Sequence, residues 1–173
     1  GETSAGIFLH RSSDDAIVKN NNVHDNGDAG MALLEISRAV VEDNTFTNNK
    51  YGVRLSVGCA DNKFENNMFK NTSRYGLYTY EGSDLPDVMD TGRSQNNIFV
   101  GNTVKGGPQS VKIKEADFTT IIDNKFEDAE VVQFQNATET FVVDNTGLDD
   151  VEIKIQEEAC FAENSDSEFK PIC

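Results

Sequence analysis

Residues 40–55, Val40-Val-Glu-Asp-Asn-Thr-Phe-Thr-Asn-Asn-Lys-Tyr-Gly-Val-Arg-Leu55, contain the pattern from which the rest of the chain is interpreted. Apolar and polar residues alternate in two short runs, one ending in Asn44-Thr-Phe46 and the other beginning at Gly52. Alternation of this kind is typical of half-buried strands, and the Asn-rich segment between the runs is typical of a corner. The stretch therefore predicts two short strands joined by a polar corner.

The same pattern recurs along the chain, anchored each time on an asparagine two residues before an apolar residue. The steps between anchors are 23, 23, 35, 22 and 21 residues, and the anchors are Asn21, Asn44, Asn67, Asn102, Asn124 and Asn145. A nearly fixed period of strand-only units is the sequence signature of a solenoid in which each repeat is one coil. We therefore expect an all-β fold, a single-stranded parallel β-helix of about six to seven coils.

Equivalent positions of successive coils are expected to stack into internal columns. The first strand contributes two columns, Val18, Val41, Phe64, Phe99, Ile121 and Val142, and Val23, Phe46, Phe69, Val104 and Phe126. The anchor asparagines between these columns should form a ladder of side-chain amide hydrogen bonds, as in other stacked sheets. The second strand starts at Gly6, Gly30, Gly52 and Gly76, where glycine would allow a positive φ at the corner.

The ends of the chain and one long step depart from the regular pattern. Gly1 begins in the middle of a repeat, so we expect residues 1–156 to form a β-helix without its N-terminal coils. Residues 157–173 are expected to cap the last coil, with Cys160 and Cys173 as a candidate disulfide and Cys59 left free. The 35-residue step contains Glu81 to Ser94, whose Gly, Pro and Asp content predicts an extruded loop overhanging the preceding strand.

Composition and charge exclude several classes of partner. The formal net charge of −15 makes nucleic acid and anionic membranes poor partners, because the average field repels polyanions. No apolar run approaches the length of a membrane span. The sequence gives no indication of the oligomeric state.

The residues expected to point outward from the second strand carry a candidate binding surface. Parity assigns to this face Phe8, His10, Ala32, Leu34, Arg54, Ser56, Tyr78, Tyr80, Lys112, Lys114, Gln133, Gln135, Lys154 and Gln156. This set contains no acid, although Asp and Glu outnumber Lys and Arg by 30 to 15. Cations and tyrosine rings along one face suit an anionic sugar polymer, and the predicted binding residues are His10, Arg11, Arg54, Tyr78, Tyr80, Lys112 and Lys114. The alternative is an ordinary solvated sheet face.

Several phrases closely resemble brown-algal mannuronan C5-epimerases, and more distantly the repeats are similar to those of bacterial alginate epimerases. The phrases are Gly6-Ile-Phe-Leu-His-Arg-Ser-Ser-Asp-Asp15, Val23-His-Asp-Asn-Gly-Asp-Ala-Gly-Met-Ala32, Asn48-Asn-Lys-Tyr-Gly-Val-Arg-Leu-Ser-Val-Gly58 and Gly92-Arg-Ser-Gln95. The resemblance extends to about Gly147. It implies a right-handed parallel β-helix, secreted to the extracellular cell wall, that converts β-D-mannuronate to α-L-guluronate within alginate.

The family's central Asp-Pro-His motif is absent from this sequence. Its closest echo is Ala5-Gly-Ile-Phe-Leu-His10, which keeps the glycine and the histidine but has Phe8-Leu9 in place of Asp-Pro. The resemblance thus places the chain on coils that extend the substrate groove, with His10, Tyr78 and Tyr80 as candidate catalytic residues. Calcium is the candidate cofactor, at acidic corners such as Asp25 and Asp28, although no dense oxygen-ligand motif is present. Two alternatives remain open, a non-catalytic alginate-binding or uronan-binding module and a polysaccharide lyase.

Overall fold

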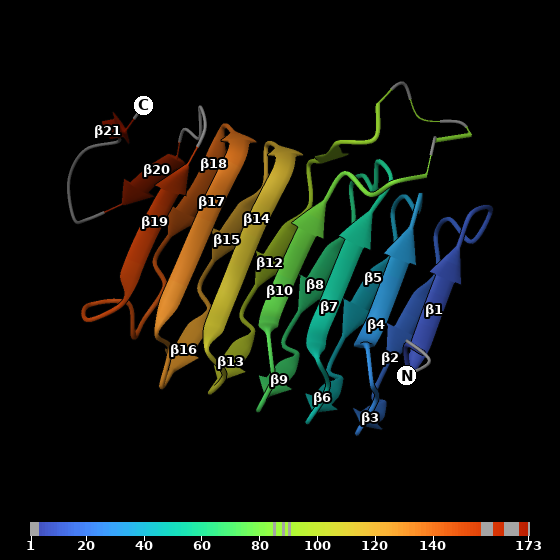
Figure 1. The fold of residues 1–173 in the computed structure, drawn as a ribbon, viewed down its shortest axis with the longest axis horizontal. Coiled ribbons are helices and arrows are strands. Elements are labelled where there is room, and N and C mark those ends of the chain that lie inside the picture. The colour runs from blue at the N-terminus through green and yellow to red at the C-terminus, as the bar shows by residue number, and fades with distance from the viewer. Residues whose placement is uncertain are drawn as a thin grey trace.

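The computed structural model describes residues 4–84, 86, 87, 89, 91–156, 161–164 and 170–172. All regular secondary structure within these residues is β-strand, arranged as a stack of similar coils (Figure 1). Within the same described ranges there is no apolar helix of membrane-spanning length. The prediction of an all-β parallel β-helix is confirmed.

The strands form three sheets that run along the stack. Sheet A has the order β1 (Ile7–His10), β4 (Ala29–Leu34), β7 (Tyr51–Ser56), β10 (Tyr75–Tyr80), β14 (Gln109–Asp117), β17 (Val131–Thr138) and β19 (Glu152–Gln156), with β11 (Ser94–Gln95) beside β14. Sheet B has the order β2 (Ile17–Lys19), β5 (Val40–Glu42), β8 (Lys63–Glu65), β12 (Ile98–Val100), β15 (Thr120–Ile122), β18 (Thr140–Val143), β20 (Phe161–Asn164) and β21 (Lys170–Ile172). Sheet C contains β3 (Asn22–His24), β6 (Thr45–Thr47), β9 (Met68–Lys70), β13 (Thr103–Lys105) and β16 (Lys125–Glu127).

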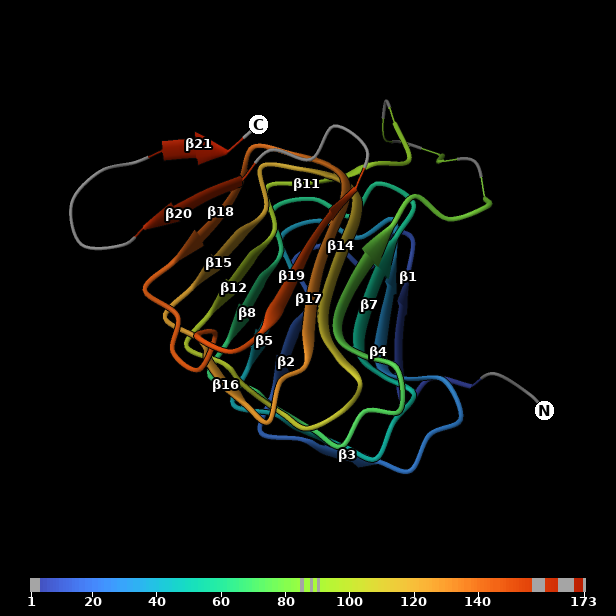
Figure 2. The same cartoon turned by 60° about the vertical axis from the view of Figure 1, so that its left-hand side comes forward.

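Each complete coil has three strands, one in each sheet, rather than the two predicted from the sequence. Figure 2 shows the three sheets as walls around a common interior. The predicted first strand is broken between β5 and β6, where Asp43 has a φ of 56°. Asp, Asn and Gly tolerate this left-handed conformation better than other residues, which explains why they occupy this corner in successive coils.

The predicted internal columns are present. Val41 pairs in register with Phe64, and Phe46 with Phe69, along sheets B and C. The side chains of these four residues are fully buried, and the rings of Phe46 and Phe69 stack with their centroids 5.2 Å apart. Stacking of like residues between coils therefore gives the chain one continuous apolar core.

The predicted asparagine ladder runs the length of the stack between sheets B and C. Asn44 donates a side-chain hydrogen bond to Oδ1 of Asn67 at 3.0 Å, and the Asn44 backbone N–H donates to the same oxygen at 3.0 Å. Asn67 repeats both bonds to Asn102 across the 35-residue step. Because these amides are buried, the ladder satisfies polar groups that would otherwise destabilise the fold.

Two shorter asparagine contacts occupy the other corners and were not predicted. Asn26 donates to Asn49 between sheets C and A, and Asn62 donates to Asn97 between sheets A and B. Both contacts were hidden in the sequence because each extends over fewer coils than the main ladder.

The glycines that open the second strand recur from coil to coil for a different reason from the one predicted. None of Gly6, Gly30, Gly52 and Gly76 has a positive φ. A Cβ atom at Gly52 would lie 2.4 Å from the carbonyl oxygen of Gly76 and 2.6 Å from the Phe69 ring. Glycine is required there because the next coil and the core ring approach too closely for any side chain.

The predicted loop leaves the end of β10, and its described residues do not overhang the tyrosines of that strand. Its described part instead runs beyond the ends of β7 and β4 toward β1 (Figure 1). Asp87 Oδ2 lies 2.6 Å from Arg11 Nη1, and the Met89 N–H donates to Glu35 Oε1 at 3.1 Å. The loop is therefore held at the edge of sheet A away from the face of β10.

The C-terminal segment extends sheet B before it ends. β20 pairs parallel to β18, as another coil would, and β21 pairs antiparallel to β20. Cys160 and Cys173 lie outside the described residues, so their pairing stays a prediction, as does the capping role of residues 157–173. Cys59 is a free thiol buried in the core.

Candidate functional site: a tyrosine cluster on sheet A

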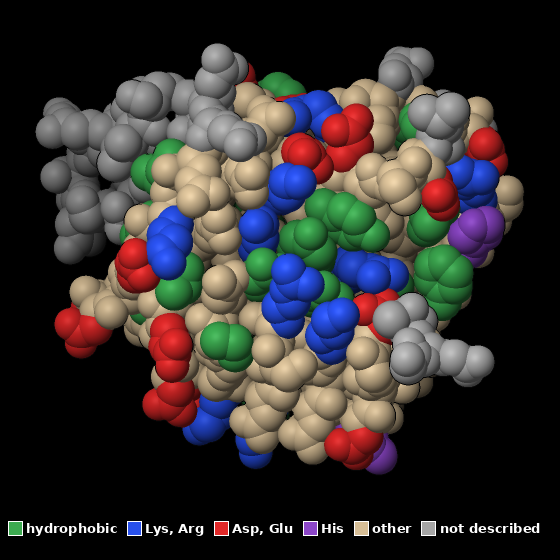
Figure 3. Space-filling view, viewed as in Figure 1, with side chains coloured by type: hydrophobic (Ala, Val, Ile, Leu, Met, Phe, Trp, Pro, Cys, Tyr) green, Lys and Arg blue, Asp and Glu red, His purple; other side chains and the backbone are tan. Residues whose placement is uncertain are grey.

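The predicted outward residues of the second strand lie in register on the outward face of sheet A, where Ala32, Ser56 and Gln133 are nevertheless buried by their neighbours. Arg54 pairs with Tyr78, and Tyr78 with Lys112, in adjacent strands. Figure 3 views this face and shows basic side chains gathered over its centre, with side chains of the hydrophobic class, in which tyrosine is counted, between them. The predicted alignment of these three residues is confirmed, whereas their binding role stays a prediction.

All four tyrosines of the chain meet on this face, and we call Tyr51, Tyr75, Tyr78 and Tyr80 the tyrosine cluster. Tyr78 is at its centre, with ring centroids 5.3 Å from Tyr51, 4.8 Å from Tyr75 and 5.0 Å from Tyr80. The sequence analysis identified Tyr78 and Tyr80 but missed the other two. Tyr51 and Tyr75 each precede one of the strand-opening glycines, and this shared position was the signal that could have identified them.

Four cations lie over the rings of the cluster, Lys50, Arg54, Arg74 and Lys112. Arg54 is paired with an acid, and we call the other three, Lys50, Arg74 and Lys112, the ring-facing cations. Lys50 Nζ is 5.3 Å from the Tyr51 centroid, and the Arg74 guanidinium carbon is 5.2 Å from that of Tyr75. Lys112 Nζ is 5.7 Å from the Tyr75 centroid. Among the residues that the structure describes, none of the three has a carboxylate within ion-pair distance. Their charge is therefore available to an anionic ligand.

Arg74 is fixed by the tyrosines themselves. Its Nη1 donates a hydrogen bond to the Tyr51 hydroxyl at 3.0 Å. Hydrogen bonding to Tyr75 and the nearby phenols raises the pKa of Arg74 above its ordinary value, which is already far above neutrality. Arg74 and Lys50 were both missed by the sequence analysis because they lie at the corner before the strand, outside the alternating positions.

The remaining predicted cations of sheet A have acidic partners. Arg54 Nη1 lies 2.9 Å from Oδ2 of the buried Asp28, and Lys114 Nζ lies 3.0 Å from Glu115. Arg11 Nε lies 2.9 Å from Glu35 Oε2. The fourteen outward positions contain no acid, but three acids lie next to them and compensate these cations: Asp28 before β4, Glu35 after β4 and Glu115 within β14. Of the predicted cations on the strands, Lys112 is the one whose charge has no described carboxylate partner.

His10 does not join the tyrosine cluster. It pairs in register with Leu34, then Ser56, then Tyr80, so three strand spacings separate it from Tyr80. At about 4.8 Å per strand this separation is about 14 Å. The resemblance also allows His10 to act with Tyr78 or Tyr80 as an acid and base on one sugar. At this distance the two side chains do not reach the same C5 atom, so the structure does not assemble that pair, and the catalytic role of each residue stays a prediction. His10 lies instead beside the exposed ring of Phe8, with centroids 5.5 Å apart.

Tyr78, the central ring of the cluster, is uncharged at neutral pH. Burial among its neighbours, followed by the nearby phenols of Tyr51, Tyr75 and Tyr80, raises the pKa of Tyr78 to about 12. Tyr78 therefore keeps its proton and offers a flat ring face and a hydroxyl group. This chemistry suits the binding of a sugar ring better than proton abstraction at neutral pH.

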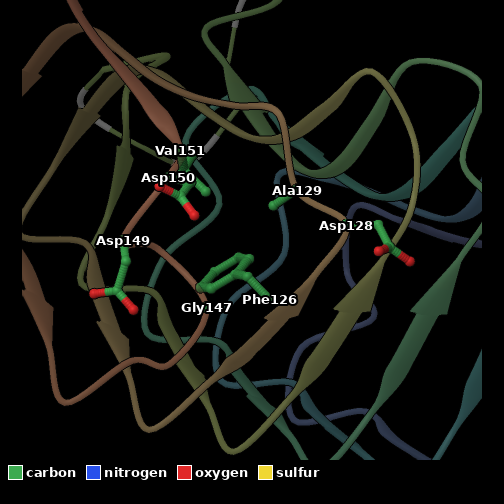
Figure 4. A pocket seen from close by; sticks show the side chains of 7 residues that line it. All are labelled: Phe126, Asp128, Ala129, Gly147, Asp149, Asp150 and Val151. Atoms are coloured by element: carbon green, nitrogen blue, oxygen red, sulfur yellow. The ribbon is translucent and has the colours of Figure 1, made fainter.

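A separate pocket lies at the opposite end of the stack from β1 and is lined by acids. Its volume is about 300 Å³, and its lining is Phe126, Asp128, Ala129, Gly147, Asp149, Asp150 and Val151. Figure 4 shows the Phe126 ring and the carboxylates of Asp128, Asp149 and Asp150 around this hollow. Three carboxylates make it unsuitable for an anionic ligand.

The structure provides no assembled site for the candidate calcium ion. Asp28 is paired with Arg54, and Asp25 lies 2.7 Å from His24 Nδ1. Across the described part of the chain, no three His, Cys, Asp or Glu side chains are grouped so as to hold a metal ion. We therefore assign no metal ligands.

Fold and site together define a class, a parallel β-helix that displays an aromatic and cationic surface on one sheet. Comparison with known proteins agrees with the fold: the family profile described as "Right handed beta helix region" matches residues 2–126. The chain belongs to this right-handed β-helix family. Searches of curated proteins and of solved structures found no match.

Proposed function

We propose that this chain binds an anionic polysaccharide of the alginate type through the tyrosine cluster and the ring-facing cations. The observation that carries the proposal is the meeting of all four tyrosines with three cations that have no carboxylate partner among the described residues, on a chain of net charge −15. The phrases shared with mannuronan C5-epimerases support the substrate class. The proposed setting is extracellular, where cell-wall alginate occurs.

The cluster is chemically complementary to a uronate polymer. Pyranose rings present C–H faces that pack on tyrosine rings, and phenol hydroxyls hydrogen-bond to sugar hydroxyls. Lys50, Arg74 and Lys112 would each pair with a uronate carboxylate. A neutral polysaccharide offers the first two contacts but not the third, so charge should distinguish the preferred ligand.

Within this proposal the chain supplies groove coils of a mannuronan C5-epimerase. Epimerisation requires neutralisation of the C5 carboxylate, a base that removes the C5 proton and an acid that returns one from the other face. The ring-facing cations fit the first role. The separation of His10 from Tyr80 removes the histidine from this part of the surface. Of the candidates predicted for the other two roles, Tyr78 and Tyr80 lie together, with ring centroids 5.0 Å apart, but the raised pKa of Tyr78 makes it a poor fit to proton transfer at neutral pH.

The separation of His10 from Tyr80 specifically favours a second candidate, a non-catalytic alginate-binding module. Both candidates predict binding, and they differ in whether the composition of the polymer changes. Guluronate formation from polymannuronate, followed by NMR of the anomeric protons, is measured with the 173-residue chain and with the full natural protein. Formation by either supports the epimerase, and binding without formation by both supports the non-catalytic module. A rise in ultraviolet absorbance from unsaturated products would instead identify the lyase alternative.

The binding proposal is tested by tyrosine fluorescence. The chain has no tryptophan, and its four tyrosines all lie in the cluster, so emission excited near the tyrosine band reports on this surface alone. Titration with alginate oligomers should change the emission saturably, and the apparent Kd should rise with salt. A neutral glucan of matched length is the control. Equal responses to both polymers, or no response to either, would refute the proposal.

A further inference from the structure

Asp28 lies beside the tyrosine cluster and contacts one of its members, Tyr51, together with the neighbouring cations Lys50 and Arg54. It precedes β4, and its side chain is only 3% exposed. Its carboxylate pairs with Arg54 at 2.9 Å, while its backbone oxygen accepts hydrogen bonds from the N–H groups of Lys50 at 2.9 Å and Tyr51 at 3.3 Å. One buried residue thus holds both the side chain of β7 that faces the cluster and the corner from which β7 starts.

Arg54 connects Asp28 to the rings. Its guanidinium carbon lies 5.9 Å from the Tyr51 centroid and 6.0 Å from the Tyr80 centroid, on two different coils. An arginine side chain has many rotamers in solution, and a buried carboxylate at hydrogen-bond distance restricts them. With its charge compensated by Asp28, Arg54 is placed to orient the rings rather than to attract a polyanion.

We propose that Asp28 is a positioning residue of the binding surface: through Arg54 it sets the arrangement of the buried Tyr51 ring and of the partly exposed Tyr80 ring, against which a sugar chain packs. The effect on ligand binding rests on the proposed function. The effect on the rings does not, because it concerns the unliganded protein.

The direction in which one substitution changes the Kd for alginate oligomers distinguishes a positioning role of Asp28 from a purely electrostatic one. Asp28→Asn removes one negative charge from an anion-binding face, so Coulomb's law alone predicts tighter binding of alginate oligomers. Loss of a positioning contact predicts the opposite, roughly tenfold weaker binding. The two explanations therefore give changes in Kd of opposite direction.

The chain contains a matched control on the same sheet. Glu35 is a fully buried carboxylate that pairs at 2.9 Å with Arg11, an outward arginine, as Asp28 does with Arg54. Both residues lie at ends of β4, but Arg11 follows His10 at the edge of the sheet, remote from the tyrosines. Glu35→Gln removes the same charge and should leave alginate binding unchanged or slightly stronger.

The experiment compares wild type, Asp28→Asn and Glu35→Gln by alginate-oligomer titration and by near-ultraviolet circular dichroism without ligand. We expect a changed tyrosine dichroism and weaker binding in Asp28→Asn alone. Equal or tighter binding by Asp28→Asn, or an equal loss in Glu35→Gln, would overturn the inference. If wild type does not bind alginate oligomers, the proposed function is refuted. The circular dichroism then still tests the positioning role, because an unchanged tyrosine spectrum in Asp28→Asn would overturn it.

A second variant protects the test against loss of folding. Asp28→Asn combined with Arg54→Gln removes both charges, so no unpaired charge is left in the partly buried site. Far-ultraviolet dichroism and the thermal midpoint establish that each variant is folded. The double variant should show the same weakened binding and altered tyrosine signal, and wild-type behaviour in both would contradict the inference.

Discussion

The outward faces of sheets A and B are built from the same coils around the same core, yet they treat their charges differently. On sheet B, Lys19 pairs with Glu42 at 2.7 Å and Lys63 pairs with Glu65 at 2.6 Å. On sheet A, the ring-facing cations lie over tyrosine rings instead. The scaffold is common to both faces, so it does not indicate which one binds a ligand. The contrast lies in whether the cations have carboxylate partners, and it points to sheet A.

The largest expected change in Kd comes from removing cations at the face of sheet A, in comparison with removing the same number from sheet B. Arg74→Ala with Lys112→Ala should weaken binding of alginate oligomers by at least about tenfold, equivalent to about 1.4 kcal/mol, because two charge-assisted contacts are lost. Lys19→Ala with Lys63→Ala removes the same charge from sheet B and should change the Kd less than about twofold. Fluorescence titration at low and high salt measures both. Comparable losses in the two double variants would show that only the overall charge matters.

A smaller effect is expected from removing one ring. Tyr80→Ala deletes the stacking partner 5.0 Å from Tyr78 and should weaken binding by about fivefold, or about 1 kcal/mol. Ile98→Ala, which truncates an exposed side chain on sheet B, is the control and should leave binding unchanged. Calorimetric titration is the suitable measurement because Tyr80→Ala also removes a fluorophore. Wild-type affinity in Tyr80→Ala would contradict the proposed role of the tyrosine rings in binding.

The third prediction concerns the alkaline limb of the stability curve. The pKa of Tyr78 is raised from 10.0 to about 12 in the folded protein, so the folded state holds this proton more tightly than the unfolded state. Its contribution is fully present below pH 10 and is lost as the pH rises through about 12. Because Tyr78 is partly exposed, the effect should be less than about 1 kcal/mol. Urea unfolding between pH 8 and 12 should therefore give a flatter profile for Tyr78→Phe than for wild type, and parallel profiles would contradict the assignment.

Cys59 contributes to the same limb for the same reason and needs a separate control. Burial raises the pKa of its thiol from 9.0 to about 11, so its contribution is present below pH 9 and is lost through about pH 11. Measuring Tyr78→Phe in a Cys59→Ala background isolates the phenol. Sheet B has no tyrosine among its described residues. The loss of stability at alkaline pH is therefore expected from Tyr78 on sheet A and from Cys59 in the core, and not from sheet B.

The smallest effect is expected from a single ion pair on sheet B. Lys63→Ala breaks the pair with Glu65 between two partly exposed side chains and should change the free energy of unfolding by less than about 0.5 kcal/mol. Urea denaturation at pH 7 with and without added salt is the measurement. A loss above about 1 kcal/mol would mean that sheet B depends on its charges for stability, and the contrast with sheet A would need revision.

Much of the fold was predictable because its strongest signals are periodic. Positions such as Val41, Phe64 and Phe99 recur at a fixed distance from the anchor asparagine, and stacked strands turn that distance into a buried column. The division of each coil into three strands was less visible. It depends on a residue in the left-handed conformation, such as Asp43, and Asp is common at any polar corner, so its residue type does not reveal the break between strands.

The site was predicted only in part. The alternation of inward and outward residues along a strand does not show which side chains of the corner residues reach the same face. Alternation placed Arg54, Tyr78 and Lys112 on one face correctly. Lys50 and Arg74 reach that face from the corners, and Asp28 lies beside the tyrosine cluster in another coil. Contacts between residues one coil apart depend on side-chain direction, which the sequence does not encode as a period.

The hydrogen bonds of the asparagine ladder do not depend on how many residues separate two successive asparagines in the sequence. The contact between Asn67 and Asn102 has the same form as that between Asn44 and Asn67, although 35 residues separate the first pair and 23 the second. A segment can therefore be inserted at the end of a sheet A strand, or one coil exchanged for another, while the internal amide bonds remain unaltered. Surface chemistry on such a rod can be edited one turn at a time, so new ligand preferences can arise by local replacement without redesign of the whole.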